Sequence, residues 1–242
     1  RWRYPLHFVD FEAATLPVPI RRGGSSYEQL LFQFSCHTLT QKGSISHHQW
    51  LETEPGKFPN FEMVKAFQKI PDIEEGTIVQ YSKFEKTAFK KIRKQLVREE
   101  GEAGNNTELL EWIHRLISRP DSNKQNGPYF ADLQRLIKQY YHNFYMNGAM
   151  SLKDVLAAVF KISGHLKTVY QQPYSSANFS DFIWWKNRDD GDDGLPENPY
   201  NLLDYEIGDG ADAFAVYGEL QERGVSDSKR KIYHDALRKY CE

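Results

Sequence analysis

The chain has 242 residues, of which 40% are hydrophobic and 26% are charged, and its formal net charge is -2. This length suits one large domain or two small ones, and the near-neutral charge excludes a histone-like coat of positive charge. No apolar run approaches the roughly 20 residues of a membrane span, and we find no signal peptide. Two cysteines, Cys36 and Cys241, are too few for a disulfide framework, so we expect a cytoplasmic setting.

Strand-forming patterns dominate the first fifty residues. An apolar, β-favouring run at 6–12 predicts the first strand. Alternating residues at 30–39 and a returning run at 44–51, joined by a turn at 41–43, predict a hairpin. Alternation in the 30–39 run predicts a half-buried strand. One side of that strand carries Leu30, Phe32, Phe34 and Cys36, and the other carries Leu31, Gln33, Ser35 and His37.

Helices alternate with short strands further along the chain. A buried strand is predicted at 77–81 and a shorter one at 129–133. Helices are predicted at 61–70, 84–98, 107–117, 134–141 and from Ser151 onward. Two more helices are predicted after possible N-caps at Asp209 and Ser226.

The order of these elements indicates the fold class. Strands come first and later strands alternate with helices, so we predict an α/β domain in which helices flank a mixed sheet. A ribonuclease-H-like order fits this pattern. We expect 1–242 to be a single such domain, with a surface insertion at 171–201 that includes the acidic run 189–193. Because the chain starts at Arg1 rather than Met, we expect it to be cut from a longer protein.

Asp10 and Glu12 are the first candidate functional residues, with one residue between them. Residues two apart on a strand face the same side, so these carboxylates repel each other unless a cation lies between them. Mg²⁺ and Mn²⁺ prefer such oxygen ligands. The alternative is a strand end whose acids simply face solvent.

Glu85 follows the strand at 77–81, at a strand-to-helix junction. Sheets of α/β proteins bind ligands at the carboxyl ends of their strands, which makes Glu85 a candidate third ligand. An ordinary first-turn glutamate, favoured by the helix dipole, is the alternative. Tyr240, in the last predicted helix, is by its pattern alone a core-facing aromatic.

These motifs, in this order, resemble the DnaQ-like (DEDD) superfamily of 3′–5′ exonucleases, and within it a bacterial family known as a domain of unknown function. Val9-Asp10-Phe11-Glu12 matches the D-x-E motif of the superfamily. The run Tyr81-Ser82-Lys83-Phe84-Glu85-Lys86-Thr87 matches its second motif, with Glu where most members have Asp. Further segments of the smaller family are matched by Tyr27-x-Gln29, Phe32-Gln33-x-Ser35-x-His37, Asp132-Leu133 and Ser151-Leu152-Lys153.

The resemblance implies a site and a mechanism. Asp10, Glu12 and Glu85 would hold two Mg²⁺ or Mn²⁺ ions, which activate a water and stabilise the leaving 3′ oxygen. Tyr240 fits the tyrosine of the third motif, Y-x-x-x-D, and would position the attacking water. The aspartate of that motif would fall beyond Glu242, so we expect this chain to lack one metal ligand.

Basic side chains near these acids are candidate contacts for nucleic acid. Lys83 and Lys86 flank Glu85, and Arg21 and Arg22 lie in the loop after the first strand. Clustered cations beside a metal site are suited to a phosphate backbone. A solvated helix face and a flexible loop are the respective alternatives.

We therefore predict a metal-dependent 3′–5′ exonuclease acting on DNA or RNA. The alternative is a nucleic-acid-binding or interaction module that keeps the fold without turnover. A glycosidase using Asp10 and Glu12 ranks last, because its carboxyl groups must lie at least ~5 Å apart across a sugar, whereas neighbours on one strand face converge.

Overall fold

The structure of the protein is a computed structural model. It describes residues 2–103, 106–118, 129–187, 196–203 and 207–241. Contacts within the chain divide it into two compact units. The first contains the described residues of 1–133, 214–225 and 241, and the second those of 134–213 and 226–240. Across the described ranges, no helix is long and apolar enough to cross a membrane.

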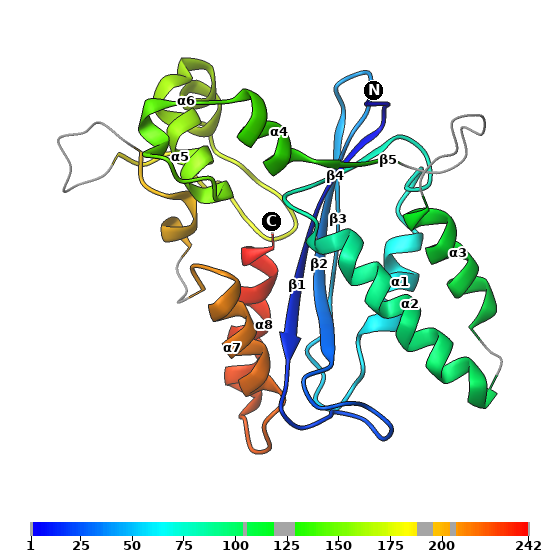
Figure 1. Cartoon of the computed structure of the whole chain (residues 1–242). Coiled ribbons are helices and arrows are strands. Elements are labelled where there is room, and N and C mark those ends of the chain that lie inside the picture. Colours follow the sequence, from blue (N-terminus) through cyan, green and yellow to red (C-terminus); the bar gives the residue numbers. More distant parts are fainter. Residues whose placement is uncertain (1, 104–105, 119–128, 188–195, 204–206, 242) are drawn as a thin grey trace, which may run out of the picture. The chain divides into compact units, whose positions relative to one another are not determined.

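A five-stranded mixed sheet forms the centre of the first unit (Figure 1). Its strands are β1 (Leu6–Thr15), β2 (Gln29–Leu39), β3 (Ile45–Leu51), β4 (Thr77–Gln80) and β5 (Tyr129–Asp132). Their order across the sheet is β3-β2-β1-β4-β5. The first three strands are antiparallel, whereas β4 is parallel to β1 and β5 is parallel to β4. The predicted α/β class is confirmed, and the arrangement fits a ribonuclease-H-like fold.

Three helices cover one face of this sheet: α1 (Asn60–Gln68), α2 (Phe84–Ala103) and α3 (Thr107–Ile117) (Figure 1). A cluster of phenylalanine rings, with centroids 5.2 to 6.4 Å apart, lies between helices and sheet. Each fully buried ring contributes about 1.5–3 kcal/mol to folding. The cluster consists of Phe11, Phe34, Phe67 and Phe89. It fixes the orientation of β1, because Phe11 points into it.

A β-bulge interrupts the alternation of β2. The register of β1 against β2 slips between Glu12 and Ala13, which leaves Phe32 as an extra residue. Phe32 stacks on Tyr217 of α7 (Gly210–Leu220), with ring centroids 4.2 Å apart, and does not join the phenylalanine cluster. The predicted grouping is therefore wrong for Leu30 and Phe32, because Leu31, and not these two residues, joins Phe34 and Cys36 in the core beneath the helices. A bulge adds a residue that strict alternation does not count. β2 is also buried on both faces rather than half-buried.

The second unit is largely helical. Ser151, Asp209 and Ser226 cap their helices through side-chain oxygens, as predicted. The unit contains α4 (Leu133–Tyr140), η1 (Phe144–Met146), α5 (Leu152–Ile162), α6 (Gly164–Tyr170), η2 (Pro199–Leu202) and α8 (Asp227–Tyr240).

The region 171–201 lies within this second unit. Its described part carries an aromatic cluster, in which the Trp184 ring lies 4.7 to 6.2 Å from those of Tyr174, Phe179 and Phe182. The acidic run 189–193 lies outside the described residues. That this region is an insertion within a single domain stays a prediction.

Candidate active site

Asp10 and Glu12 lie on the face of β1 that points away from the phenylalanine cluster. Their neighbours Val9 and Phe11 are buried in the core beneath α1 to α3. Because side chains alternate along a strand, both carboxylates occupy the opposite face, as their spacing predicts. Asp10 is exposed and Glu12 is half-buried.

Glu85 lies at the start of α2, the helix that follows the neighbouring strand β4. β4 runs parallel to the start of β1 and ends at Gln80, and α2 begins four residues later. The Gln80 side chain fixes that helix start, because its Oε1 accepts a hydrogen bond from the Lys86 N–H at 3.1 Å. Ser82, in the connecting turn, has a φ of 77°, a conformation that non-glycine residues rarely adopt. Such strained backbone is concentrated at functional sites.

The Glu85 carboxyl group is buried and incompletely bonded. Its residue is 3% exposed, and its Oε2 has no hydrogen-bond partner among the described residues. Burial raises the pKa of Glu85 to about 8, and repulsion from Asp10, Asp132 and Glu12 adds to this rise. The Glu85 N–H opposes it by bonding to the carboxylate. The other three acids therefore lie close enough to act on Glu85.

The pKa of Asp10 is also raised, mainly by desolvation, while the Phe11 N–H lowers it. The Asp10 side chain nevertheless keeps contact with solvent. Protein atoms thus crowd this carboxylate without sealing it from water. That combination suits a group that must meet a ligand from solution.

Asp132 belongs to this acidic group and was not among the predicted site residues. It is the last residue of β5 and lies opposite Gln80 in the parallel register of β4 and β5. An acid at the end of a predicted strand was a usable signal, the same one that indicates Glu85. Its proximity to Glu85 depends on strand order, which periodicity does not reveal.

The four acids fit a divalent cation in the chemistry of their oxygens. Mg²⁺ and Mn²⁺ prefer carboxylate ligands, and the unpaired Glu85 Oε2 is a buried acceptor that lacks a positive partner. Within the described ranges, however, no three His, Cys, Asp or Glu side chains form a group that could hold a metal ion. Charge repulsion acts over distances much longer than the ~2.0–2.6 Å of a metal–oxygen bond. These acids are therefore close enough to repel one another, but their oxygens are not arranged around a common point that a metal ion could occupy.

Residues 7–151 match the family model described as a domain of unknown function, DUF2779. The matched stretch is more than half of the chain. The chain belongs to this family. No curated protein and no solved structure matches it. The DUF2779 region contains all four acids, so the candidate site lies wholly within the matched part.

Two of the predicted nucleic-acid contacts, Lys83 and Lys86, lie beside Glu85 in the DUF2779 region. Lys83 is exposed. Lys86 is half-buried, and its Nζ lies 5.0 Å from the centre of the Phe130 ring. No ion pair joins either lysine to Glu85 in the described part of the chain.

The other two predicted contacts differ from each other. Arg22 is exposed in the loop after β1. The Arg21 guanidinium stacks on Phe58, 3.6 Å from the ring centre, and pairs with Glu28 and Glu99. Arg21 is therefore held by internal contacts, which occupy much of its bonding capacity.

Tyr240 is the last residue of α8 and lies beyond the DUF2779 match, in the second unit. It is half-buried. Its role as the residue that positions water stays a prediction.

Proposed function

We propose that this member of the DUF2779 family is a metal-dependent hydrolase that removes nucleotides from the 3′ end of DNA or RNA, like the DnaQ-like superfamily that its motifs resemble. One observation carries the proposal. A buried glutamate with an unpaired oxygen and a raised pKa lies at the carboxyl end of a central strand, surrounded by other acids. Those acids are Asp10, Glu12 and Asp132.

A purely structural role explains this cluster poorly. Burying a carboxyl group without a partner costs free energy, and grouping like charges adds to that cost. In the described part of the first unit, no basic side chain pairs with Glu85 to offset this cost. A bound divalent cation would supply the missing positive charge. The free-energy cost of burying Glu85 among other acids is therefore explained if the cluster binds such a cation.

The residues Asp10, Glu12 and Glu85 would hold the ion, with Asp132 beside them. When bound, such an ion lowers the pKa of a water and neutralises charge on the leaving oxygen. Near pH 7 the free protein keeps a proton on Glu85, because its pKa is about 8. Ion binding would then displace that proton, since ligands bind metal in the deprotonated form.

Lys83 and Lys86 would contact the phosphates of the strand being cut, since Lys86 lies on the first turn of α2 and Lys83 lies directly before that helix, on either side of Glu85. The exposed Lys83 is the freer of the two, because Lys86 also lies over the Phe130 ring.

A binding module without turnover is the second candidate. It is favoured by the absence of a ready-made metal-holding group among the described residues. In that case the acids would keep their repulsion, and nucleic acid would bind without being cut.

One experiment separates the two candidates. The full-length gene product is incubated with single-stranded DNA or RNA, labelled at the 3′ or the 5′ end, in Mn²⁺ or in EDTA. A nuclease releases the 3′ label first, shortens the 5′-labelled strand stepwise and stops in EDTA. Asp10→Asn and Glu85→Gln should abolish cutting, whereas Glu75→Gln, an exposed acid outside the site, should not. Binding without cutting, unaffected by Asp10→Asn, would establish the module instead.

A further inference from the structure

A cavity of about 690 Å³ lies in the first unit, at the end of β1. Its walls are Thr15 of β1, the loop 25–29 and the side chains of α2 between Lys91 and Arg98. None of these residues belongs to the acidic cluster. Thr15 lies three residues beyond Glu12, or roughly 10 Å along an extended strand.

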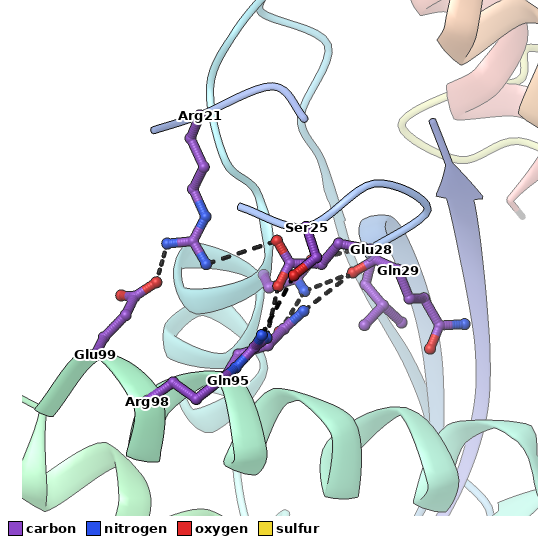
Figure 2. A network of polar contacts seen from close by, with 9 residues as sticks. Arg21, Ser25, Glu28, Gln29, Gln95, Arg98 and Glu99 are labelled. Atoms are coloured by element: carbon purple, nitrogen blue, oxygen red, sulfur yellow. Dashed lines mark hydrogen bonds and ion pairs between the residues drawn. The ribbon is translucent and has the colours of Figure 1, made fainter. Parts of the chain in front are cut away.

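A polar network holds the two walls of this cavity together (Figure 2). Buried Asn60 donates to the Gln29 carbonyl at 2.8 Å and to the Gln95 side chain at 2.7 Å. Glu28 pairs with Arg98 at 2.9 Å and with Arg21 at 3.8 Å. The loop is thereby fixed against α2, so the cavity is built into the fold.

The lining of the cavity carries an excess of positive charge. Lys91, Arg93 and Lys94 are exposed, and none has a hydrogen bond or ion pair in the described part of the chain. The single acid in the lining, Glu28, is already neutralised by its two arginines. Three basic residues are therefore available to an anion.

Two of these cations lie on the same face of α2. Lys91 and Lys94 are three residues apart, and Arg98 continues that face but is already paired with Glu28. The helix rises about 1.5 Å per residue, so the two lysines lie about 4.5 Å apart along the helix axis. A nucleic-acid strand presents a phosphate about every 3.4 Å along a duplex axis, so the two lysines can contact two successive phosphates of one polymer.

Tyr27 adds an aromatic surface to the same cavity. It is 68% exposed and has a φ of 56°, which is uncommon for a bulky side chain. Its N–H donates to the Leu16 carbonyl at 2.8 Å, which helps to hold the loop in this conformation. An exposed ring beside a basic groove is the arrangement that proteins use to stack bases of single strands.

We propose that this cavity binds a single strand of nucleic acid, with Lys91 and Lys94 on its phosphates and Tyr27 stacked on a base. This inference rests on the proposed function, because the strand bound in the cavity would be the substrate whose 3′ end is cut at Asp10 and Glu12. The cavity then holds nucleotides upstream of the cut.

The test measures binding in EDTA, so that it does not depend on cutting. Fluorescence anisotropy of a labelled single-stranded DNA, and of an RNA of the same sequence, is recorded over a range of salt concentrations. Lys91→Glu/Lys94→Glu should weaken binding at least about tenfold and reduce the slope of log affinity against log salt by about 1.4, since each phosphate contact accounts for about 0.7. Tyr27→Ala should weaken binding by about tenfold, whereas Tyr27→Phe keeps the ring and should bind like the wild type.

A matched control separates a site from general charge. Lys42→Glu/Lys69→Glu makes the same change in net charge, at exposed positions that lie outside the cavity lining and outside α2. Equal weakening by both double variants, or equal binding by Tyr27→Ala and Tyr27→Phe, would overturn the proposal. Displacement of the oligonucleotide by millimolar inorganic phosphate would also overturn it, in favour of a small-anion site.

The outcomes distinguish this inference from the proposed function. If cavity variants lose binding while the wild type never cuts DNA or RNA, the cavity stands and the nuclease is rejected. If the wild type cuts in Mn²⁺ while cavity variants bind like the control, only the cavity is rejected.

Discussion

Two glutamates with buried side chains in the first unit differ in the charges that surround them. The Glu28 side chain is 8% exposed and has two arginines, Arg21 and Arg98, as ion-pair partners. The Glu85 residue is 3% exposed, and the charges that act on it belong to other acids. Both lie on or beside the same helix, α2, and only one of them is compensated.

The difference indicates which acid is part of the architecture and which awaits a ligand. A buried charge that a fold needs is normally paired within the fold. Glu28 follows that rule, and its pairs join the 25–29 loop to α2. Glu85 has no such partner and keeps a proton near pH 7 instead. It lies beyond the carboxyl end of β4, where α/β proteins bind ligands.

The largest expected effect is a pH dependence of stability that belongs to Glu85. An unfolded glutamate ionises near pH 4.5, whereas folded Glu85 keeps its proton to about pH 8. Between these values the folded state binds more protons, so the free energy of unfolding falls as pH rises, by about 3–5 kcal/mol in total. Glu85→Gln has no proton to lose and should not show this fall. Urea unfolding in EDTA from pH 4 to 9 measures the free energy of unfolding of both proteins. If the two proteins show the same dependence on pH, the pKa of Glu85 is not raised and this prediction is wrong.

A divalent cation should offset that loss. Mn²⁺ at about a hundredfold excess over its dissociation constant should raise the free energy of unfolding by about 3 kcal/mol. The gain should be larger at pH 8 than at pH 6, because protons compete for the carboxylates. Thermal unfolding with and without Mn²⁺ measures it, with Glu75→Gln as the matched control. An equal gain in Asp10→Asn and in the wild type would place the ion elsewhere.

Breaking the compensated site should have a smaller effect. Glu28→Gln leaves Arg21 and Arg98 without their shared carboxylate, and we expect a loss of about 1–3 kcal/mol in the free energy of unfolding. The effect lies below that of a fully buried pair because the Arg98 side chain is 57% exposed. Arg98→Gln should cost less, since Arg21 still pairs with Glu28. Urea unfolding measures both variants, and no loss in Glu28→Gln would mean that the network does not stabilise the loop.

Local patterns were sufficient to predict most elements of the first unit. The helix expected at 107–117 is α3 (Thr107–Ile117), and the turn expected at 41–43 joins β2 to β3. These predictions worked because periodicity and turn residues are properties of a short stretch of chain. The pairing of Asp10 with Glu12 on one face follows from the same local rule.

What depended on distant parts of the chain was not predicted. Asp132 joins the acidic group through the pairing of β5 with β4, which no local pattern encodes. The helix α6 (Gly164–Tyr170) was also missed, because only Ser163 separates it from α5 and its first residue, Gly164, is typical of a helix end rather than a start. The bulge at Phe32 depends on how β1 and β2 pair, so alternation within β2 alone put this ring on the wrong side.

Tyr217, the partner of Phe32, provides the smallest and most selective test. Its residue is fully buried, and its hydroxyl has no hydrogen-bond partner among the described residues. It is thus a neutral counterpart of the unpaired Glu85 oxygen. Tyr217→Phe removes the hydroxyl and keeps the ring stacked on Phe32, so we expect a gain of about 0–1 kcal/mol in the free energy of unfolding.

Urea unfolding of Tyr217→Phe decides how much an unpaired buried oxygen signifies in this protein. A gain or no change means that the hydroxyl truly lacks a partner, and that the fold tolerates such a group when it carries no charge. A loss of more than about 1 kcal/mol means that the hydroxyl is satisfied, for example by a bound water. The unpaired Glu85 oxygen would then cease to identify a site by itself, and the inference there would depend on the repulsion among its acidic neighbours.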